Sequence, residues 1–232
     1  MFSKGSNDFI LLLKRFDMNA QARYSITKPF EALQVSTFIC SELTKDMRKP
    51  EDCIITDATA GVGGDTINFA KYFKYVNAVE IDPDTFQRLN NNIRSFGLRN
   101  IYTYLGNYIK LYKNFIQDLI YIDFPWGGTA YKYKQEVQLY LNEDNECKPS
   151  TNECKPSTNE SKATVLDIIE LLFKKWPEVL IFIKVPFNVS LDSFKHYITS
   201  ESIIFNKAGK PSFKVLKITR TLRKISLNIL EV

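Results

Sequence analysis

Long apolar runs are missing from this chain of 232 residues. A helix needs about 20 consecutive apolar residues to cross a bilayer, and no segment of the sequence approaches that length. Near the N-terminus, the apolar stretch Phe9 to Leu13 is followed by Lys14 and Arg15 rather than by the small residues of a signal-peptide cleavage site. We therefore expect neither a membrane span nor a secretion signal, and we place the protein in the cytoplasm or the nucleus.

Metal-ligand and disulfide patterns are also missing. The chain has four cysteines and one histidine, but it has no Cys-x-x-Cys pair and no cysteine close in sequence to His196. Cysteines in a chain without a secretion signal are expected to stay reduced. We expect neither a bound metal nor a disulfide framework.

A large excess of one charge is missing as well, because 31 basic residues face 26 acidic ones and leave a net charge of +5. This balance favours a polyanionic partner only weakly, since many basic proteins touch no nucleic acid. The length fits a single globular domain with one core. Any functional assignment must therefore come from the motifs.

Short β-rich runs alternate with helical patterns through the middle of the chain. This alternation predicts βαβ units and a mostly parallel sheet. The predicted strands are Cys53 to Ala58, Asn77 to Asp82, Ile101 to Leu105, Leu119 to Ile122 and Val179 to Lys184. The predicted helices are Asp65 to Phe73 and Asp84 to Phe96, and an earlier helix runs from Pro29 to about Lys45.

The C-terminal part follows a different pattern. Ser202 to Asn206 and Phe213 to Arg220 are β-like and are joined by a turn segment, which predicts an antiparallel hairpin. We divide the chain into a helical extension, residues 1–46, that closes over the active site, and a catalytic domain, residues 47–232. Inside that domain a polar stretch of about 142–162 contains the tandem repeat 146–152 and 153–159, and we expect it to be a disordered insertion.

A glycine-rich segment, Asp57 to Asp65, follows the first predicted strand and opens a helix. Glycines at such a turn let a ligand approach the backbone closely. The spacing matches neither the dinucleotide fingerprint nor the phosphate-binding loop, and no lysine follows Gly64 to neutralise a triphosphate. The segment predicts a binding loop, with an ordinary strand-to-helix turn as the alternative.

Polar side chains follow the next two strands. Glu80 and Asp82 lie on the same face of the second strand, where a carboxylate can accept both hydroxyls of a ribose. We assign Glu80 to that role and Asp82 to the cap of the following helix, with the reverse assignment as the alternative. Asn107, after the third strand, can accept a hydrogen bond from an adenine amine through its side-chain carbonyl.

The fourth strand leads into Asp-Phe-Pro-Trp, residues 123–126, which resembles the (Asn/Asp/Ser)-Pro-Pro-aromatic motif of amino methyltransferases. The lone pair of an exocyclic base nitrogen is delocalised into the ring, so catalysis needs acceptors that fix the N–H groups and receive positive charge. Asp123 suits this role, and Trp126 offers a face on which a base can stack. The alternative for Trp126 is a core residue, which is our interpretation of Trp176.

Together these segments resemble the catalytic domain of trimethylguanosine synthases, which methylate N2 of guanine in RNA caps. The resemblance covers most of the chain and is carried by residues 15–17, 24–27, 57–66, 78–83 with Asn91 and Asn92, and 125–131. It implies a seven-stranded Rossmann-like core of the class I methyltransferases. It also implies S-adenosylmethionine as the methyl donor and an N-terminal helical part that closes over the cap.

The resemblance implies roles for individual residues as well. Donor-binding residues would be Ser25, Thr27, Asp57, Thr59, Ala60, Gly61, Gly63, Thr66, Glu80, Asp82, Asn107 and Asp123. Acceptor-binding residues would be Phe16, Tyr24, Trp126, Lys184, Asn188, Lys210 and Lys214. The catalytic residues would be Asp123, Pro125 and Trp126.

Two departures from the family pattern affect the expected site. The family's Ser-Pro-Pro-Trp is here Asp-Phe-Pro-Trp, residues 123–126. The family's Pro-Arg-Asn, whose arginine binds cap phosphates, is here Pro-Phe-Asn, residues 186–188. Phosphate contacts must then come from other side chains, for which Lys184, Lys210 and Lys214 are candidates, and solvated lysines are the alternative for each.

The predicted function is methyl transfer from S-adenosylmethionine to the exocyclic N2 of a 7-methylguanosine cap on RNA. One alternative is an enzyme that methylates adenine N6 or guanine N2 in DNA, rRNA or tRNA, which needs no cationic base. Another is a cap- or RNA-binding module without catalysis. Phe124 is the one motif change that favours the binding module, whereas the intact glycines and Glu80 oppose it.

Overall fold

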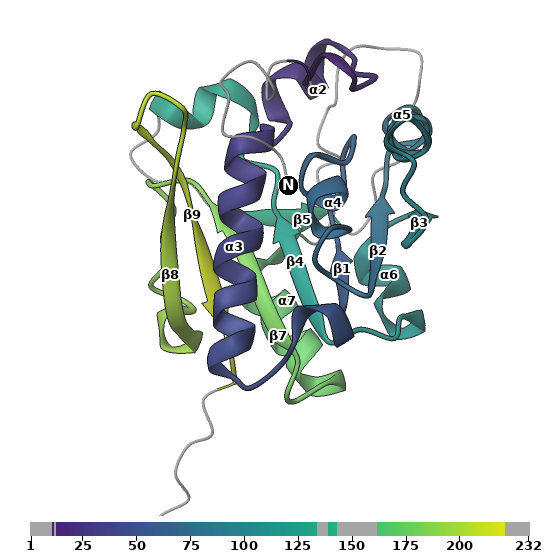
Figure 1. The fold of residues 1–232 in the computed structure, drawn as a ribbon. Helices are drawn as coiled ribbons and strands as arrows, with labels where there is room; N and C mark the ends of the chain where they lie inside the picture. The colour runs from purple at the N-terminus through teal and green to yellow at the C-terminus, as the bar shows by residue number, and fades with distance from the viewer. Residues whose placement is uncertain (1–10, 12, 134–138, 143–161, 221–232) are drawn as a thin grey trace, which may run out of the picture.

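The computed structural model describes residues 11, 13–133, 139–142 and 162–220. At its centre lies a seven-stranded sheet with the strand order β3-β2-β1-β4-β7-β9-β8 (Figure 1). The strands are β1 Ile54–Asp57, β2 Tyr75–Glu80, β3 Ile101–Leu105, β4 Leu119–Asp123, β7 Leu180–Val185, β8 Ile198–Phe205 and β9 Pro211–Ile218. The first five are mutually parallel, and β9 runs antiparallel to both β7 and β8. The predicted Rossmann-like sheet with its terminal hairpin is confirmed.

Helices cover both faces of this sheet (Figure 1). They are α2 Ala20–Ser25, α3 Pro29–Lys45, α4 Gly64–Phe69, α5 Pro83–Phe96, α6 Tyr108–Leu111 and α7 Val165–Lys175. Side chains alternate along β4, so that Tyr121 faces the α3 layer while Ile120 and Ile122 face the α7 layer. The sheet therefore has a core on each face, and α3 is part of one of them.

Several predicted boundaries are wrong by a few residues. The helix after the glycine loop ends at Phe69 instead of Phe73, because Lys71 and Tyr72 already make the tighter bonds of a turn to Asn68 and Phe69. β2 ends at Glu80, and Asp82 has left the strand to accept a bond from Thr85 as the N-cap of α5. β8 begins at Ile198, four residues before the predicted start.

Some elements had not been predicted as such, among them α7 and the short strands β5 and β6. α7 opens with a capping box between Thr164 and Asp167 and ends at Trp176. β5, Tyr140–Asn142, pairs in antiparallel fashion with β6, Lys162–Thr164, at the two ends of the predicted insertion. The repeat and the expected disorder between these strands lie outside the described residues.

Among residues 11, 13–133, 139–142 and 162–220, no helix is both long and apolar enough to cross a membrane. The same residues contain no cluster of three or more histidine, cysteine, aspartate or glutamate side chains that could hold a metal ion.

Candidate functional site

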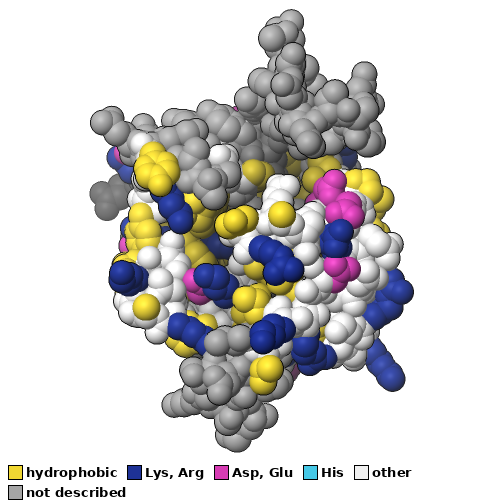
Figure 2. Space-filling model, turned by 90° about the horizontal axis from the view of Figure 1, so that it is seen from above, with side chains coloured by type: hydrophobic (Ala, Val, Ile, Leu, Met, Phe, Trp, Pro, Cys, Tyr) yellow, Lys and Arg dark blue, Asp and Glu magenta, His cyan; other side chains and the backbone are white. Residues whose placement is uncertain are grey.

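The carboxyl ends of β1, β2 and β4 meet at one edge of the sheet, at the top of Figure 1. Ligands of open α/β sheets bind at this edge, because loops diverge there and leave room. Figure 2 looks down on it and shows basic side chains spread around apolar ones. The predicted site residues that follow these strands are therefore gathered on one face.

The glycine loop between β1 and α4 is shaped by what lies around each glycine. Gly63 has φ +98° and caps α4, and a Cβ on it would lie 2.9 Å from Leu89 Cδ1. A Cβ on Gly64 would lie 2.7 Å from the carbonyl oxygen of Thr27. Gly61 differs, since it has φ +54° and no atom would lie within 4 Å of an added Cβ. The open space at Gly61 is where a ligand can reach the backbone.

Glu80 closes the second side of this loop. Its Oε2 accepts a bond from the Gly61 amide at 2.8 Å, and its Oε1 accepts one from the Asp82 amide at 2.8 Å. Burial raises the pKa of this carboxyl, and the backbone amides oppose the rise. A carboxylate has about four acceptor positions, so this one can still accept a hydrogen bond from a ligand. Asp82 is the N-cap of α5, as assigned, while ligand binding by either acid stays a prediction.

Asn107 lies beside Glu80, because the Gly106 amide donates to the Glu80 carbonyl at 2.8 Å. Its side-chain oxygen accepts a bond from the Ile109 amide at 3.0 Å and so caps α6. A carbonyl oxygen has a second lone pair, so the expected contact with an adenine amine is compatible with this cap.

Asp57 and Thr66 lie beneath the loop. Asp57 is 1% exposed, and its Oδ2 accepts a bond from Thr66 Oγ1 at 2.6 Å. Burial raises the pKa of Asp57 to about 8, and the neighbouring carboxyls of Asp65 and Asp123 add to the rise. These two side chains fasten β1 to α4. Thr59 and Ala60 continue the loop, where Thr59 Oγ1 accepts from the Asp123 amide at 2.8 Å and the Ala60 amide donates to Val79.

Asp123 ends β4, and its residue partner across the sheet is Lys184 of β7. Lys184 Nζ donates to Asp123 Oδ2 at 2.7 Å and to Thr27 Oγ1 at 2.7 Å. Thr27 in turn donates to Asp65 Oδ2 at 2.5 Å, which also accepts from Tyr121. A polar network thus joins the N-terminal segment, α4 and two central strands.

The charges of this network stabilise one another. Burial lowers the pKa of Lys184, but Asp123 and Asp65 outweigh that effect and raise it, so the lysine remains an ammonium. Burial raises the pKa of Asp123, and the Lys184 ammonium opposes the rise. The side chain of Asp123 is 23% exposed, and its Oδ1 makes no hydrogen bond with the described residues. One carboxylate oxygen is therefore held and the other is available.

Trp126 lies at the rim of both cores. Its ring centroid lies 5.0 Å from that of Tyr131 and 6.2 Å from that of Phe213. The ring is half-buried, and its Nε1 is buried without a hydrogen-bond partner among the described residues. Asp65 Oδ1 is likewise buried and has no hydrogen-bond partner among the described residues. Since buried polar atoms are normally bonded, two orphaned atoms near the polar network indicate space for a polar ligand or water.

Phe124 and Pro125 are adjacent in sequence but have different surroundings. Phe124 is 1% exposed and packs in the α7-side core, so its substitution for a proline supplies core volume. Pro125 is exposed beside Trp126. The presence of Phe124 in place of the family's proline, which favoured a non-catalytic binding module, is thus explained by core packing.

The predicted site residues of the N-terminal segment do not all lie at the polar network. Phe16 packs on Phe96 at the end of α5, with ring centroids 5.0 Å apart, and Tyr24 is 82% exposed on α2. Ser25 donates to the Gln21 carbonyl of its own helix. Thr27 alone among these four bonds to the polar network, and acceptor binding by Phe16 and Tyr24 stays a prediction.

The three lysines predicted to contact phosphates lie in different environments. For Lys184 the alternative of a solvated lysine is wrong, because the residue is 3% exposed in a wholly buried strand. Lys210 is exposed in the β8–β9 turn, and Lys214 lies 3.5 Å from Glu201 in an ion pair. Asn188 Nδ2 donates to the Tyr131 carbonyl at 2.9 Å and fastens the loop after β7 to the Trp126 segment.

Sequence reasoning missed two members of the network, Asp65 and Tyr121. Asp65 lies in the glycine-rich segment but was given no role in the site, and Tyr121 belongs to no motif. The partnership of Lys184 with Asp123 was also unforeseen. A signal was present, because a single lysine inside the apolar run of β7 must be buried with a charged partner.

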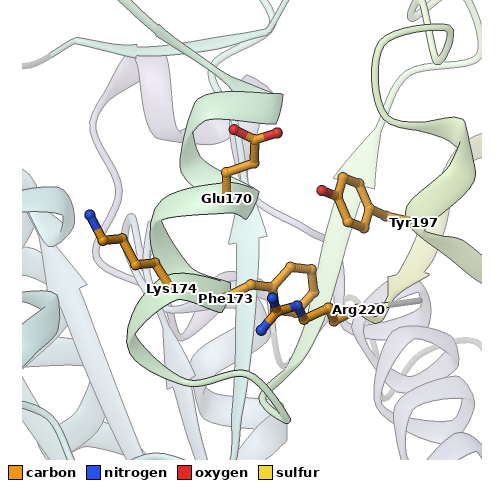
Figure 3. A pocket seen from close by; sticks show the side chains of 5 residues that line it. All are labelled: Glu170, Phe173, Lys174, Tyr197 and Arg220. Atoms are coloured by element: carbon orange, nitrogen blue, oxygen red, sulfur yellow. The ribbon is translucent and has the colours of Figure 1, made fainter. Parts of the chain in front are cut away.

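A cavity elsewhere does not belong to this site. It has a volume of about 260 Å³ and lies between α7 and the end of the hairpin. Figure 3 shows the Glu170 carboxylate and the Tyr197 hydroxyl on its two sides, with Arg220 beside Phe173. Its lining includes none of the predicted site residues.

Comparisons with known proteins identify the family of the chain. Residues 52–202, more than half of the chain, match the model of the family described as RNA cap guanine-N2 methyltransferase. The uncharacterized protein L320 of Acanthamoeba polyphaga mimivirus is 32% identical over 171 residues, which are 71% of this chain and 59% of that protein. The trimethylguanosine synthase of Schizosaccharomyces pombe is 31% identical over 139 residues, 55% of each chain. The chain thus spans little more than half the length of these relatives.

Solved structures share the fold. An RNA methyltransferase from Salinibacter ruber, in complex with S-adenosyl-L-homocysteine, superposes with a TM-score of 0.50 at 10% identity and covers 86% of this chain and 97% of that one. At this identity the likeness concerns the fold alone.

Proposed function

The chain belongs to the RNA cap guanine-N2 methyltransferase family, and from this premise we propose that it methylates the exocyclic N2 of a 7-methylguanosine cap on RNA. Membership confirms the resemblance to trimethylguanosine synthases and S-adenosylmethionine as the cofactor. The observation that carries the proposal is Asp123, whose side chain is 23% exposed and held through one oxygen, three residues before the partly exposed Trp126.

The donor fits the glycine loop. Gly61 leaves open space above the backbone, Glu80 is placed to accept from ribose hydroxyls, and Asn107 follows β3 where an adenine amine would lie. When bound, S-adenosylmethionine supplies a methyl group activated by its sulfonium. The chain's own contribution is to hold that group in line with the amine, which is worth several powers of ten in rate.

The acceptor half of the proposal rests on charge. Three carboxyl groups, those of Asp123, Asp65 and Glu31, act on one ammonium, that of Lys184. Such a site favours a cationic base over a neutral one, and 7-methylguanine is cationic. The face of Trp126 adds a cation–π attraction of about 0.5 to 2 kcal/mol. Lys184 Nζ already lies 5.5 Å from the ring centroid, so a stacked base uses the opposite face.

Asp123 acts on the amine through its free oxygen. Oδ1 accepts a hydrogen bond from the N2–H and receives the proton that the nitrogen loses once it has gained the methyl group. Ile26 and Thr27 lie against Gly64 at the start of α4, and their segment is placed to exclude water from the reaction. We extend this role to the predicted N-terminal extension, residues 1–46.

The RNA beyond the cap is a polyanion, which suits the basic side chains on the same face (Figure 2). Lys210 and Lys214 of the hairpin remain our candidates for phosphate contacts. Lys184 is not among them, because two of its three protons are already used by Asp123 and Thr27.

A second candidate function is methylation of adenine N6 or guanine N2 in uncapped nucleic acid. The carboxylate at Asp123 favours it, because the general amino methyltransferase motif accepts Asp at this position. The two candidates differ in whether the base must carry a positive charge.

The test gives the protein labelled S-adenosylmethionine with 7-methyl-GDP, GDP or uncapped RNA. We expect transfer to 7-methyl-GDP at least about tenfold faster than to GDP, the factor that 1.4 kcal/mol of cation–π and charge attraction provides. Equal transfer to GDP or to uncapped RNA would exclude cap specificity. Cap binding with no transfer to any acceptor would favour the non-catalytic module.

A further inference from the structure

Lys184 occupies a place where a lysine is costly. β7 is buried along its whole length, and burying an ammonium is unfavourable unless it is paired and hydrogen-bonded. Two of its protons go to Asp123 Oδ2 and Thr27 Oγ1, and its remaining side faces Phe213, whose ring centroid lies 4.5 Å away. All of its polar contacts are therefore directed at the site.

The position of Asp123 is fixed from two directions. Its amide donates to Thr59 Oγ1 at 2.8 Å, which holds the main chain at the end of β4. Its Oδ2 is bonded to Lys184, which holds the side-chain rotamer. With both fixed, Oδ1 can occupy only one region, on the partly exposed side of the carboxylate. Without Lys184 the side chain would be free to rotate toward solvent.

The same lysine connects this carboxylate to the N-terminal segment. Thr27 accepts from Lys184 and donates to Asp65, and its carbonyl oxygen lies against Gly64 of the donor loop. Displacement of Thr27 would remove one of the two oxygen partners of the ammonium.

We infer that Lys184 is the positioning residue of the methyl-transfer reaction: it holds Asp123 through Oδ2 so that Oδ1 faces the acceptor amine, and through Thr27 it makes this geometry depend on the docked N-terminal segment. The inference rests on the proposed function for the identity of the amine. It does not require that the amine belong to a cap.

Other charged and titratable groups face this pair and must be counted in any pH profile. They are Asp57 at the end of β1, Asp65 and Tyr121 in the network, Glu31 of α3 and Tyr131 after Trp126. The carboxyls of Asp57 and Asp65 repel a charge on Asp123, whereas Lys184 is the cation that offsets them.

The test measures the effect of Lys184→Met twice, once in the chain that has Asp123 and once in the Asp123→Asn variant. We expect kcat to fall by about 100-fold, the effect of a misplaced catalytic group, while the KM of the donor changes by less than about threefold. The acidic limb of the kcat profile should move to higher pH, because Asp123 loses its cation. In the Asp123→Asn background the same substitution should lower kcat by no more than about threefold, since Lys184 acts through Asp123.

Lys217→Met is the matched control. Lys217 is also a buried lysine, 6% exposed in β9, but it pairs with Glu42 of α3 and with Asp46, the C-cap of that helix, rather than with site residues. The Lys217→Met substitution should lower the free energy of unfolding without moving the pH profile of kcat. A Lys184→Met effect that is equal in both Asp123 backgrounds, or a pH profile that moves equally in the control, would overturn the inference.

A readout without turnover separates this inference from the function. Carbon-13 NMR of the Asp123 carboxyl should give a higher pKa in Lys184→Met than in the wild type, and trypsin should cut faster at Arg23 or Lys28. An unchanged Asp123 pKa overturns the inference whatever the acceptor is. Failure of the acceptor assay alone overturns only the cap assignment.

Discussion

The backbone of Gly64 lies directly against that of Thr27, so that an added Cβ would come within 2.7 Å of the Thr27 carbonyl oxygen. Backbone atoms cannot move aside as a flexible side chain can. The residue that opens α4 is thus also the surface on which the N-terminal segment rests.

Gly64→Ala should therefore displace residues 26–28. We expect a loss of about 1–3 kcal/mol in the free energy of unfolding, the usual cost of overpacking, and faster trypsin cleavage at Arg23 and Lys28. Gly209→Ala is the control, since Gly209 has φ +72° in the hairpin turn and open space around it. It should lower stability by about 1 kcal/mol and leave the cleavage rate unchanged.

Gly61→Ala tests the donor site. Gly61 and Gly97 have similar conformations, φ +54° and φ +68°, and neither has an atom within 4 Å of an added Cβ. Alanine at either position should cost about 1 kcal/mol of strain. Calorimetry should show at least about a tenfold loss of S-adenosylhomocysteine affinity for Gly61→Ala alone. Equal affinities in the two variants would mean that the donor does not approach this loop.

Asp57→Asn tests the buried carboxyl. Its pKa is raised from its ordinary value of 3.8 to about 8, so the protonated form is favoured in the folded state. The stability it contributes is complete below about pH 4 and is lost as the pH rises through 8, with a slope of up to about 1.4 kcal/mol per pH unit. Asparagine cannot ionise, and its amide can still pair with Thr66 and Thr59. In urea unfolding, the free energy of unfolding of the variant relative to that of the wild type should be higher at pH 8 than at pH 5. The same difference at both pH values would contradict a raised pKa of Asp57.

Trp126→Ala tests the stacking platform. It should weaken binding of 7-methyl-GDP by about tenfold while donor affinity changes by less than about threefold. Trp176→Ala is the matched control, because Trp176 packs edge-on against Tyr112 at the end of α7, with ring centroids 5.7 Å apart. That variant should lose about 1–3 kcal/mol of stability and bind both ligands normally. Equal loss of donor and acceptor binding in Trp126→Ala would identify Trp126 as a core residue.

The parallel strands and the terminal hairpin could be predicted from the sequence, because parallel strands and glycine turns leave local patterns. Glu80 and Asp82 could be ranked correctly for the helix cap, since Pro83 marks the start of α5. Boundaries were less predictable where a tertiary contact decides them, as at the end of α4.

The polar network could not be predicted, because it joins residues distant in sequence. Thr27 and Lys184 are 157 positions apart, and only the sheet register places Lys184 beside Asp123. Lys184 was therefore assigned to phosphate, on its charge alone. The positions of Phe16 and Tyr24 likewise depend on how the N-terminal segment docks on α5.

The most direct measurement of the central claim is to identify the methylated atom. A capped RNA is incubated with the protein and S-adenosylmethionine, digested to nucleosides and analysed by mass spectrometry. We expect a guanosine that carries its 7-methyl group and at least one new methyl on N2, formed only from 7-methylated caps. A methylated adenosine, or N2-methylguanosine from within the RNA chain, would contradict it.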